Sequence, residues 1–362
     1  MQLKKEGSLL LLAGLIIGVI ASLLVYFGNP ANMGFCIACF LRDTAGGLGL
    51  HQAAAVQYVR PEILGLALGA FLMAVVRKEF NPRGGSSPLT RFIIGFFVMI
   101  GCLMFLGCPF RTILRLAGGD LNAIFGLVGY VLGILVGVFF LNKGFSLKRS
   151  YRQGVAEGGL FTFFVLALLL VLAFVPSILH FTQAGKGPGG SHALLLVSLG
   201  AGLVVGGLAQ LTRMCMVGGV RDLVLLKEWR LLGGFIAVLV GALLTNLALT
   251  SFTAGTFFKL GFLEQPIAHT DGLWNALGMM LAGLGSVMLG GCPMRQLVMS
   301  GEGSGDSAVT ILGLLTGAAF AHNFGLASSA KGPTFHGQIA VVFGLVLLLV
   351  IASLNTFKKA DA

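Results

Sequence analysis

Charged side chains are scarce in this chain. Only 10% of its 362 residues are Asp, Glu, Lys or Arg, and 56% are hydrophobic. Soluble globular domains carry about 25% charged residues, so the scarcity excludes a soluble fold. Apolar runs of about 18 residues or more recur along the chain, each long enough to cross a bilayer. Because helices satisfy their own backbone hydrogen bonds in lipid, we predict an all-α integral membrane protein.

The apolar runs predict about ten transmembrane helices. The predicted spans are residues 8–27, 61–76, 92–107, 121–141, 160–179, 193–210, 231–250, 273–290, 307–326 and 338–354. The first span follows two lysines and could be mistaken for a signal peptide. Its apolar core of about 20 residues is longer than the usual 7–15, so we interpret it as a retained helix.

Several chemical signatures are missing from the sequence. No segment resembles a nucleotide-binding loop, so we expect a protein that does not itself hydrolyse ATP and is not an enzyme. Cysteine is limited to six residues, and these stand apart from one another or next to arginines. That arrangement has the wrong charge for a cation, so we expect neither a metal site nor a cofactor.

The net charge is strongly positive, at +11 from 24 Lys and Arg and 13 Asp and Glu. This excess would suit nucleic acid, but most of the basic residues fall on the termini and on alternate connections between spans. Such a distribution is the positive-inside pattern of membrane proteins. It predicts a multi-pass protein with both termini in the cytoplasm, and no nucleic acid partner.

A first motif occurs twice. "GFCIACFLRD" at residues 34–43 aligns with "RMCMVGGVRD" at residues 213–222. The residues that match are, in pairs, Cys36 and Cys215, Arg42 and Arg221, and Asp43 and Asp222. Each aspartate either supports the arginine of a short half-helix in the pathway or forms a structural ion pair with it at the membrane surface. The sequence leaves both interpretations open.

A second motif is repeated in the same order. "GCPFRTILRLAGGD" at residues 107–120 aligns with "GCPMRQLVMSGEGSGD" at residues 291–306. Two motifs at nearly the same spacing indicate a duplication. Each half then has five spans, and an odd number turns the second half over in the membrane. We predict one membrane domain of two inverted repeats, residues 1–185 and 186–362, with the motifs on short re-entrant half-helices.

The Cys-Pro step of this second motif predicts two helix starts. Proline is favoured at the first position of a helix, where its missing N–H costs nothing. Pro109 and Pro293 should therefore begin helices, with Cys108 and Cys292 as their N-cap residues. The free N–H groups and the positive end of the helix dipole favour anions and thiolates at such a position.

An arginine follows each Cys-Pro step. Arg111 and Arg295 lie in the first turn of each predicted helix, where a cation opposes the helix dipole. An anion would complete this arrangement, and we treat both arginines as anion-stabilising. The alternative is a proline that only breaks the helix and a cysteine that packs as a small apolar residue. The matched repetition of the motif favours the anion site.

One pair of cysteines has redox spacing. Cys36 and Cys39 form the only C-x-x-C in the chain, a spacing found in thiol oxidoreductases. The position that matches Cys39 in the second half is Gly218, so Cys39 falls outside the repeated set. A membrane thiol oxidoreductase is therefore the alternative function. His322, near the end of a span, either shapes a pathway or is a hydrogen-bonded structural residue.

At these motifs the sequence resembles the YeeE/YedE sulfur-transport family, and most closely its YedE branch, which is linked to selenium transport. The resemblance extends over essentially the whole chain. It implies an inner-membrane bacterial permease that imports a small sulfur- or selenium-containing anion through a narrow, cysteine-lined central pathway. The thiols that correspond by motif are Cys36, Cys108 and Cys292, with Cys215 as the counterpart of Cys36.

The two Cys-Pro steps depart from the thiosulfate-importing members of that family, which lack the proline. Pro109 and Pro293 therefore favour a selenium species, with thiosulfate next. We expect three kinds of partner: a small inorganic chalcogen anion, membrane lipid, and a cytoplasmic protein that accepts sulfur or selenium.

Overall fold

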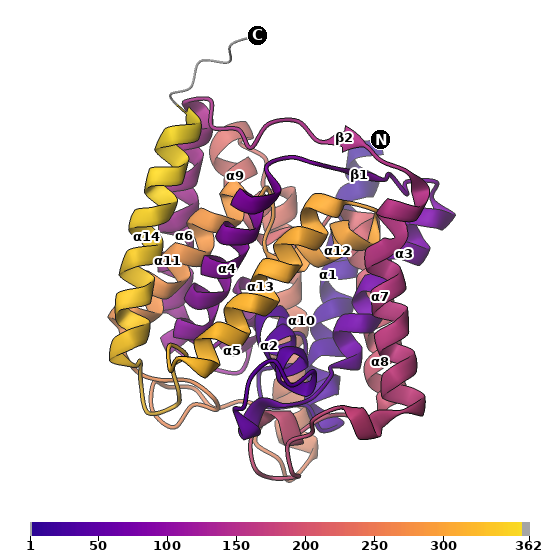
Figure 1. The fold of residues 1–362 in the computed structure, drawn as a ribbon. Helices are drawn as coiled ribbons and strands as arrows, with labels where there is room; N and C mark the ends of the chain where they lie inside the picture. Colours follow the sequence, from indigo (N-terminus) through magenta and orange to yellow (C-terminus); the bar gives the residue numbers. More distant parts are fainter. Residues whose placement is uncertain (1, 357–362) are drawn as a thin grey trace.

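The computed structural model describes residues 2–356, and within them the chain forms fourteen α-helices joined by short connections (Figure 1). The long helices are α1 (Gln2–Tyr26), α3 (Pro61–Val76), α4 (Pro88–Phe105), α6 (Asn122–Asn142), α7 (Val155–Phe174), α8 (Leu195–Thr212), α10 (Arg230–Phe252), α11 (Gly272–Met288), α13 (Gly305–Asn323) and α14 (Phe335–Thr356). The short helices are α2 (Ile37–Gly47), α5 (Pro109–Ala117), α9 (Met216–Leu226) and α12 (Pro293–Gly301).

The rest of the regular structure is small. Two strands, β1 (Arg83–Gly84) and β2 (Tyr151–Arg152), pair antiparallel. They were not predicted from the sequence. Three 3₁₀ turns cover Ala54–Val56, Pro176–Ile178 and Pro188–Gly190. The molecule is therefore nearly all helical, as the composition predicts.

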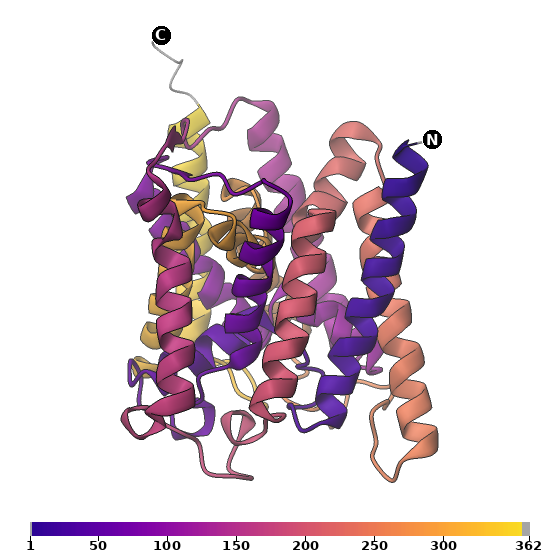
Figure 2. The same ribbon diagram turned by 90° about the vertical axis from the view of Figure 1, so that its right-hand side faces the viewer.

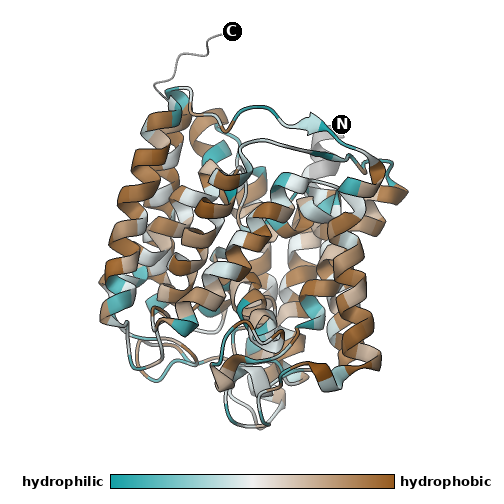
Figure 3. Cartoon of the chain, in the orientation of Figure 1, coloured by the Kyte–Doolittle hydropathy of each residue, from teal (hydrophilic) through white to brown (hydrophobic). Residues whose placement is uncertain are grey.

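Nine helical segments of the described chain are long and apolar enough to cross a membrane. Figure 3 shows hydrophobic residues along these helices and hydrophilic ones gathered at the two ends of the bundle. The predicted count of about ten agrees with this number and with the ten long helices. The span predicted at residues 307–326 is a helix, α13, but Asp306, His322 and Asn323 near its ends make it less apolar.

The two ends of the bundle differ in what they hold. Helix α1 begins and α14 ends at the same end, which also carries the two strands (Figure 1). The short helices α9 and α12 lie toward that end, whereas α2 and α5 lie toward the opposite one. Lys358 and Lys359, two of the basic residues behind the charge pattern, fall outside the described residues.

The long helices pair across the two halves of the chain in a reciprocal way. Helix α1 packs along α10 and α3 along α8, and likewise α4 packs along α13 and α6 along α11. Figure 2 shows the first of these pairs side by side. In each case a helix of one half packs against a helix of the other half, and the reciprocal pair is also present. A duplication with a pseudo-two-fold axis would produce this pattern. The two inverted repeats themselves stay a prediction.

Glycines bring the paired backbones close together. A Cβ atom on Gly129 of α6 would overlap the backbone carbonyl of Ala276 on α11. Small residues at helix contacts allow such close approach in membrane proteins. The close packing matters for function because α4, α6, α11 and α13 surround the short helices.

Replacement of Gly129 by alanine tests this contact. The added methyl group would push α6 away from α11, so we expect Gly129→Ala to lower the free energy of unfolding by about 1–3 kcal/mol or more. Gly159 on α7 is the matched control, since a Cβ atom there meets nothing within 4 Å. Thermal unfolding of both variants in detergent gives the comparison, and equal melting temperatures would contradict the account.

Candidate functional site

Each of the four short helices begins immediately after a cysteine. Helices α5 and α12 start at Pro109 and Pro293, as the sequence predicts. Their N-cap residues, like those of α2 and α9, have extended backbone angles. The four N-cap residues are Cys36, Cys108, Cys215 and Cys292.

The structure brings Cys36 and Cys108 together, and we call them the first thiol pair. Their thiols lie close to each other. The Cys36 sulfur accepts from the backbone N–H of Cys39 at 3.4 Å. The Cys108 sulfur faces the backbone N–H groups of Ala38 and Arg111. The N-termini of α2 and α5 therefore converge on one buried pair of thiols.

Cys215 and Cys292 come together in the same way, and we call them the second thiol pair. Their thiols also lie close to each other. The Cys215 sulfur faces the N–H of Gly218, and the Cys292 sulfur faces those of Met216 and Arg295. This pair lies between the N-termini of α9 and α12, so the two motifs of each half form one site.

Both pairs combine features that suit an anion. The four cysteines are at most 8% exposed, so a bound group would lose most of its water there. Backbone N–H groups and the positive ends of two helix dipoles point at each pair. Helix N-termini are common anion sites in proteins. The thiols add soft, weakly polar contacts that hard oxygen ligands do not offer.

Arg111 lies beside the first thiol pair and is completely buried. Its guanidinium donates to the backbone carbonyls of Asn32 (3.1 Å), Leu106 and Ile267 (3.4 Å), and lies 3.9 Å from the Cys39 sulfur. Among the described residues no carboxylate lies within ion-pair distance of it. A buried charge without a counter-charge is costly, so Arg111 leaves the first site with a positive charge for an anion.

Arg295, the matching arginine, has a different environment. It pairs with Glu302 at 3.3 Å, and the same carboxylate also pairs with Arg83 at 3.2 Å and Arg213 at 3.0 Å. Three guanidinium groups therefore share one carboxylate. The second site remains positive, but the charge of Arg295 is partly compensated.

Cys39 belongs to the first site, which the repeat comparison missed. Its sulfur lies 3.9 Å from the Arg111 guanidinium and donates to the Leu106 carbonyl at 3.7 Å. The C-x-x-C spacing was the available signal, because residues three apart share one face of a helix. All six cysteines are free thiols in the structure.

A cavity leads toward the first site. It has a volume of about 270 Å³ and lies near the end of α1, between that helix, α5 and α10. Asn32 and Gly34, just before Cys36, form part of its wall. The Asn32 carbonyl accepts from Arg111. Asn32 therefore lies between the cavity and the arginine and contacts both.

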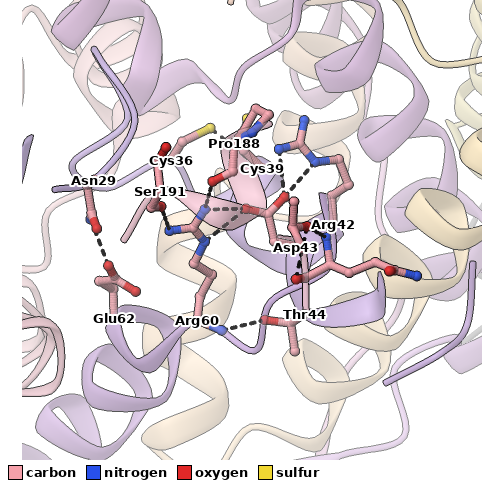
Figure 4. Close-up of polar contacts among 12 residues, drawn as sticks. Asn29, Cys36, Cys39, Arg42, Asp43, Thr44, Arg60, Glu62, Pro188 and Ser191 are labelled. Atoms are coloured by element: carbon pink, nitrogen blue, oxygen red, sulfur yellow. Dashed lines mark hydrogen bonds and ion pairs between the residues drawn. The ribbon is translucent and has the colours of Figure 1, made fainter. Parts of the chain in front are cut away.

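Arg42 and Asp43 form a buried ion triad with Arg60 (Figure 4). One carboxylate oxygen of Asp43 lies 2.6 Å from Arg42 and the other lies 2.7 Å from Arg60. Arg60 also donates to the backbone carbonyls of Pro188 and Ser191. The triad thus ties α2 to the connection between the two halves. Arg60 was not among the predicted site residues, because it precedes an ordinary Pro-initiated helix.

The matching pair in the second half is weaker. Arg221 and Asp222 lie 2.8 Å apart, but their side chains are 33% and 17% exposed. Neither pair contacts a thiol pair through its side chains, so the geometry favours the structural interpretation of both. His322 belongs to the same surroundings, since its ring stacks at 4.7 Å on His51, which bonds the Arg42 carbonyl.

The difference between the two pairs gives a stability test. Asp43→Asn leaves two buried guanidinium groups without their counter-charge, so we expect a loss of about 3–5 kcal/mol in the free energy of unfolding. Asp222→Asn is the matched control, with an expected loss below about 1 kcal/mol. Chemical unfolding of both variants in detergent measures the difference. A similar loss in both would show that the triad does not stabilise the fold.

Comparison with known proteins bears on this geometry. Residues 211–358, which contain the second thiol pair and Arg295, match the family model described as Sulphur transport. No curated protein matches the chain. The family match does not separate a selenium branch from the rest. The helices make this a multi-pass membrane protein, and its residues 211–358 are similar to the sulphur transport family.

Proposed function

We propose that this protein is a permease that imports a small sulfur- or selenium-containing anion across the bacterial inner membrane. A selenium species is favoured, and thiosulfate is next. The observation that carries the proposal is the convergence of helix N-termini on two buried thiol pairs, with Arg111 uncompensated at the first. The similarity of residues 211–358 to the sulphur transport family supports the same conclusion.

The first thiol pair would take the anion from its water shell. An anion that enters a buried site needs new hydrogen-bond donors and positive potential in place of hydration. The N–H groups of Ala38, Cys39 and Arg111 already face the two sulfurs of this pair. Thiol S–H groups add donors that a sulfur or selenium atom accepts readily, because both partners are soft and polarisable.

The two pairs would act as successive stations. Helices α2 and α5, which begin at the first pair, lie toward the end of the bundle opposite the termini, and α9 and α12, which begin at the second pair, lie toward the end where α1 begins (Figure 1). If the termini are cytoplasmic, as the charge pattern predicts, the first pair faces the periplasmic side. Transport needs sites that bind well enough for entry and weakly enough for release.

The arginines would make the positive potential that attracts the anion stronger at the first site than at the second. Arg111 has no carboxylate partner among the described residues, whereas Arg295 shares Glu302 with two other arginines. The anion would therefore meet the stronger positive potential first and the partly compensated one second. This order suits capture from a dilute outside solution and release into the cell.

Uptake by cells or liposomes that carry the chain tests the proposal. Labelled selenite, selenide and thiosulfate are compared, and we expect at least one to enter in a protein-dependent way. Cys108→Ser should abolish this uptake, because the smaller, harder oxygen removes the soft contact while the helix start remains. Cys102→Ala is the control, since Cys102 lies within α4 and caps no helix.

Uptake of none of the three anions, with the protein present in the membrane, would contradict the proposed function. Full uptake by Cys108→Ser would remove the thiol pathway from it.

A second test addresses the unequal arginines. Arg111→Gln removes a charge-assisted contact to the anion, so we expect the KM for uptake to rise about 10- to 100-fold. Arg295→Gln should raise the KM less, because Glu302 already offsets its charge. Initial uptake rates over a range of substrate concentrations give both values, with melting temperatures as the check on folding. A larger effect from Arg295→Gln would reverse the assignment of the capture site.

A further inference from the structure

Two buried hydroxyl groups near the centre of the molecule have no hydrogen-bond partner. They belong to Tyr130 on α6 and Ser286 on α11, both completely buried. Neither hydroxyl oxygen makes a hydrogen bond of normal geometry, and the two hydroxyls are neighbours that are close enough to pair with each other. Buried polar groups are nearly always paired, and each unpaired one calls for an explanation.

The hydroxyls lie beside the second thiol pair. The backbone carbonyl of Ser286 accepts from the N–H of Gly291 at 2.9 Å, and Gly291 is the residue before Cys292. Helix α6, which carries Tyr130, packs against α9, whose N-cap residue is Cys215. The unpaired groups therefore adjoin the place where two helix N-termini already converge.

Ser286 has a counterpart in the first half that lacks a hydroxyl. The Cys102 carbonyl accepts from the N–H of Gly107 at 2.8 Å, and Gly107 is the residue before Cys108. The same bond in the same place identifies Cys102 as the match of Ser286. The first half therefore has no hydroxyl at this position.

Tyr130 also has a counterpart without a hydroxyl. Gly129, the preceding residue, packs against the backbone carbonyl of Ala276, and Gly313 packs in the same way against that of Phe92. Leu314, which follows Gly313, is then the match of Tyr130, and it is completely buried. The pair of hydroxyls is thus a feature of the second site alone.

The chemistry of the hydroxyls points to an acceptor on the ligand. Each hydroxyl offers one O–H donor, and the neighbouring N–H groups of Met216, Gly218 and Arg295 are donors as well. Carboxylates, which a cation would need, do not line this place in the described chain. A ligand with acceptor oxygens would satisfy all of these donors together.

We propose that Tyr130 and Ser286 form an oxygen-binding subsite for the transported anion. Their hydroxyls donate to its oxygen atoms while its sulfur or selenium atom lies against Cys215 and Cys292. The inference rests on the proposed function and adds to it a difference between the two stations. The first site recognises charge and the chalcogen atom, and the second also recognises oxygen.

The test is transport by the full chain in liposomes, with labelled thiosulfate or selenite, whichever the wild-type protein carries. Tyr130→Phe and Ser286→Ala each remove one hydroxyl with little change in volume. We expect each to raise the KM about tenfold, as the loss of one hydrogen bond to an anion does, without a change in melting temperature. Ser286→Thr keeps the hydroxyl and should restore the wild-type KM.

Thr310→Val is the matched control for the loss of a buried hydroxyl. Thr310 is completely buried, but its hydroxyl donates to the Asp306 carbonyl within α13, so its removal should leave the KM unchanged. Wild-type KM values in both Tyr130→Phe and Ser286→Ala would overturn the subsite.

The outcomes separate the subsite from the proposed function. If uptake depends on Cys108 but not on the two hydroxyls, the subsite is wrong and the permease stands. Uptake of selenide with neither oxyanion also overturns the subsite alone. Absence of any uptake by the wild-type protein contradicts the proposed function.

Discussion

The convergence of two helix N-termini on a buried pair of thiols is the arrangement on which the rest of the structure depends. The short helices α2 and α5 meet at Cys36 and Cys108, and α9 and α12 meet at Cys215 and Cys292. Backbone N–H groups in an apolar interior cost free energy of folding unless a ligand or a side chain accepts a hydrogen bond from them. The long helices, which pack closely through glycine contacts, hold the short helices in this arrangement.

The two thiol pairs are alike in backbone and different in side chains. Arg111 and Cys39 give the first site an uncompensated charge and a third thiol. The second site has an arginine partly neutralised by Glu302 and two unpaired hydroxyls. Two sites that are alike in backbone thus differ in chemistry, and in the proposed transport the anion would meet the stronger positive charge first.

The sequence predicted the local chemistry better than the long-range contacts. Proline at position 109 has one natural place in a helix, so the N-cap position of Cys108 followed from the sequence. Its contact with Cys36 depends on how distant helices pack, and no local pattern encodes that. The ion triad shows the same limit, because Arg60 looks like an ordinary residue before a proline. Tyr130 and Ser286 gave no signal, since single hydroxyls in apolar helices are usually satisfied locally.

The most direct measurement of the central claim is the position of the bound anion. Selenium scatters X-rays anomalously, so crystals of the protein with selenite would locate it without ambiguity. The account predicts an anomalous peak between Cys36, Cys108 and Arg111, and a second, weaker one beside Cys215 and Cys292. Selenium bound only away from both thiol pairs, in a protein that transports selenite, would contradict it.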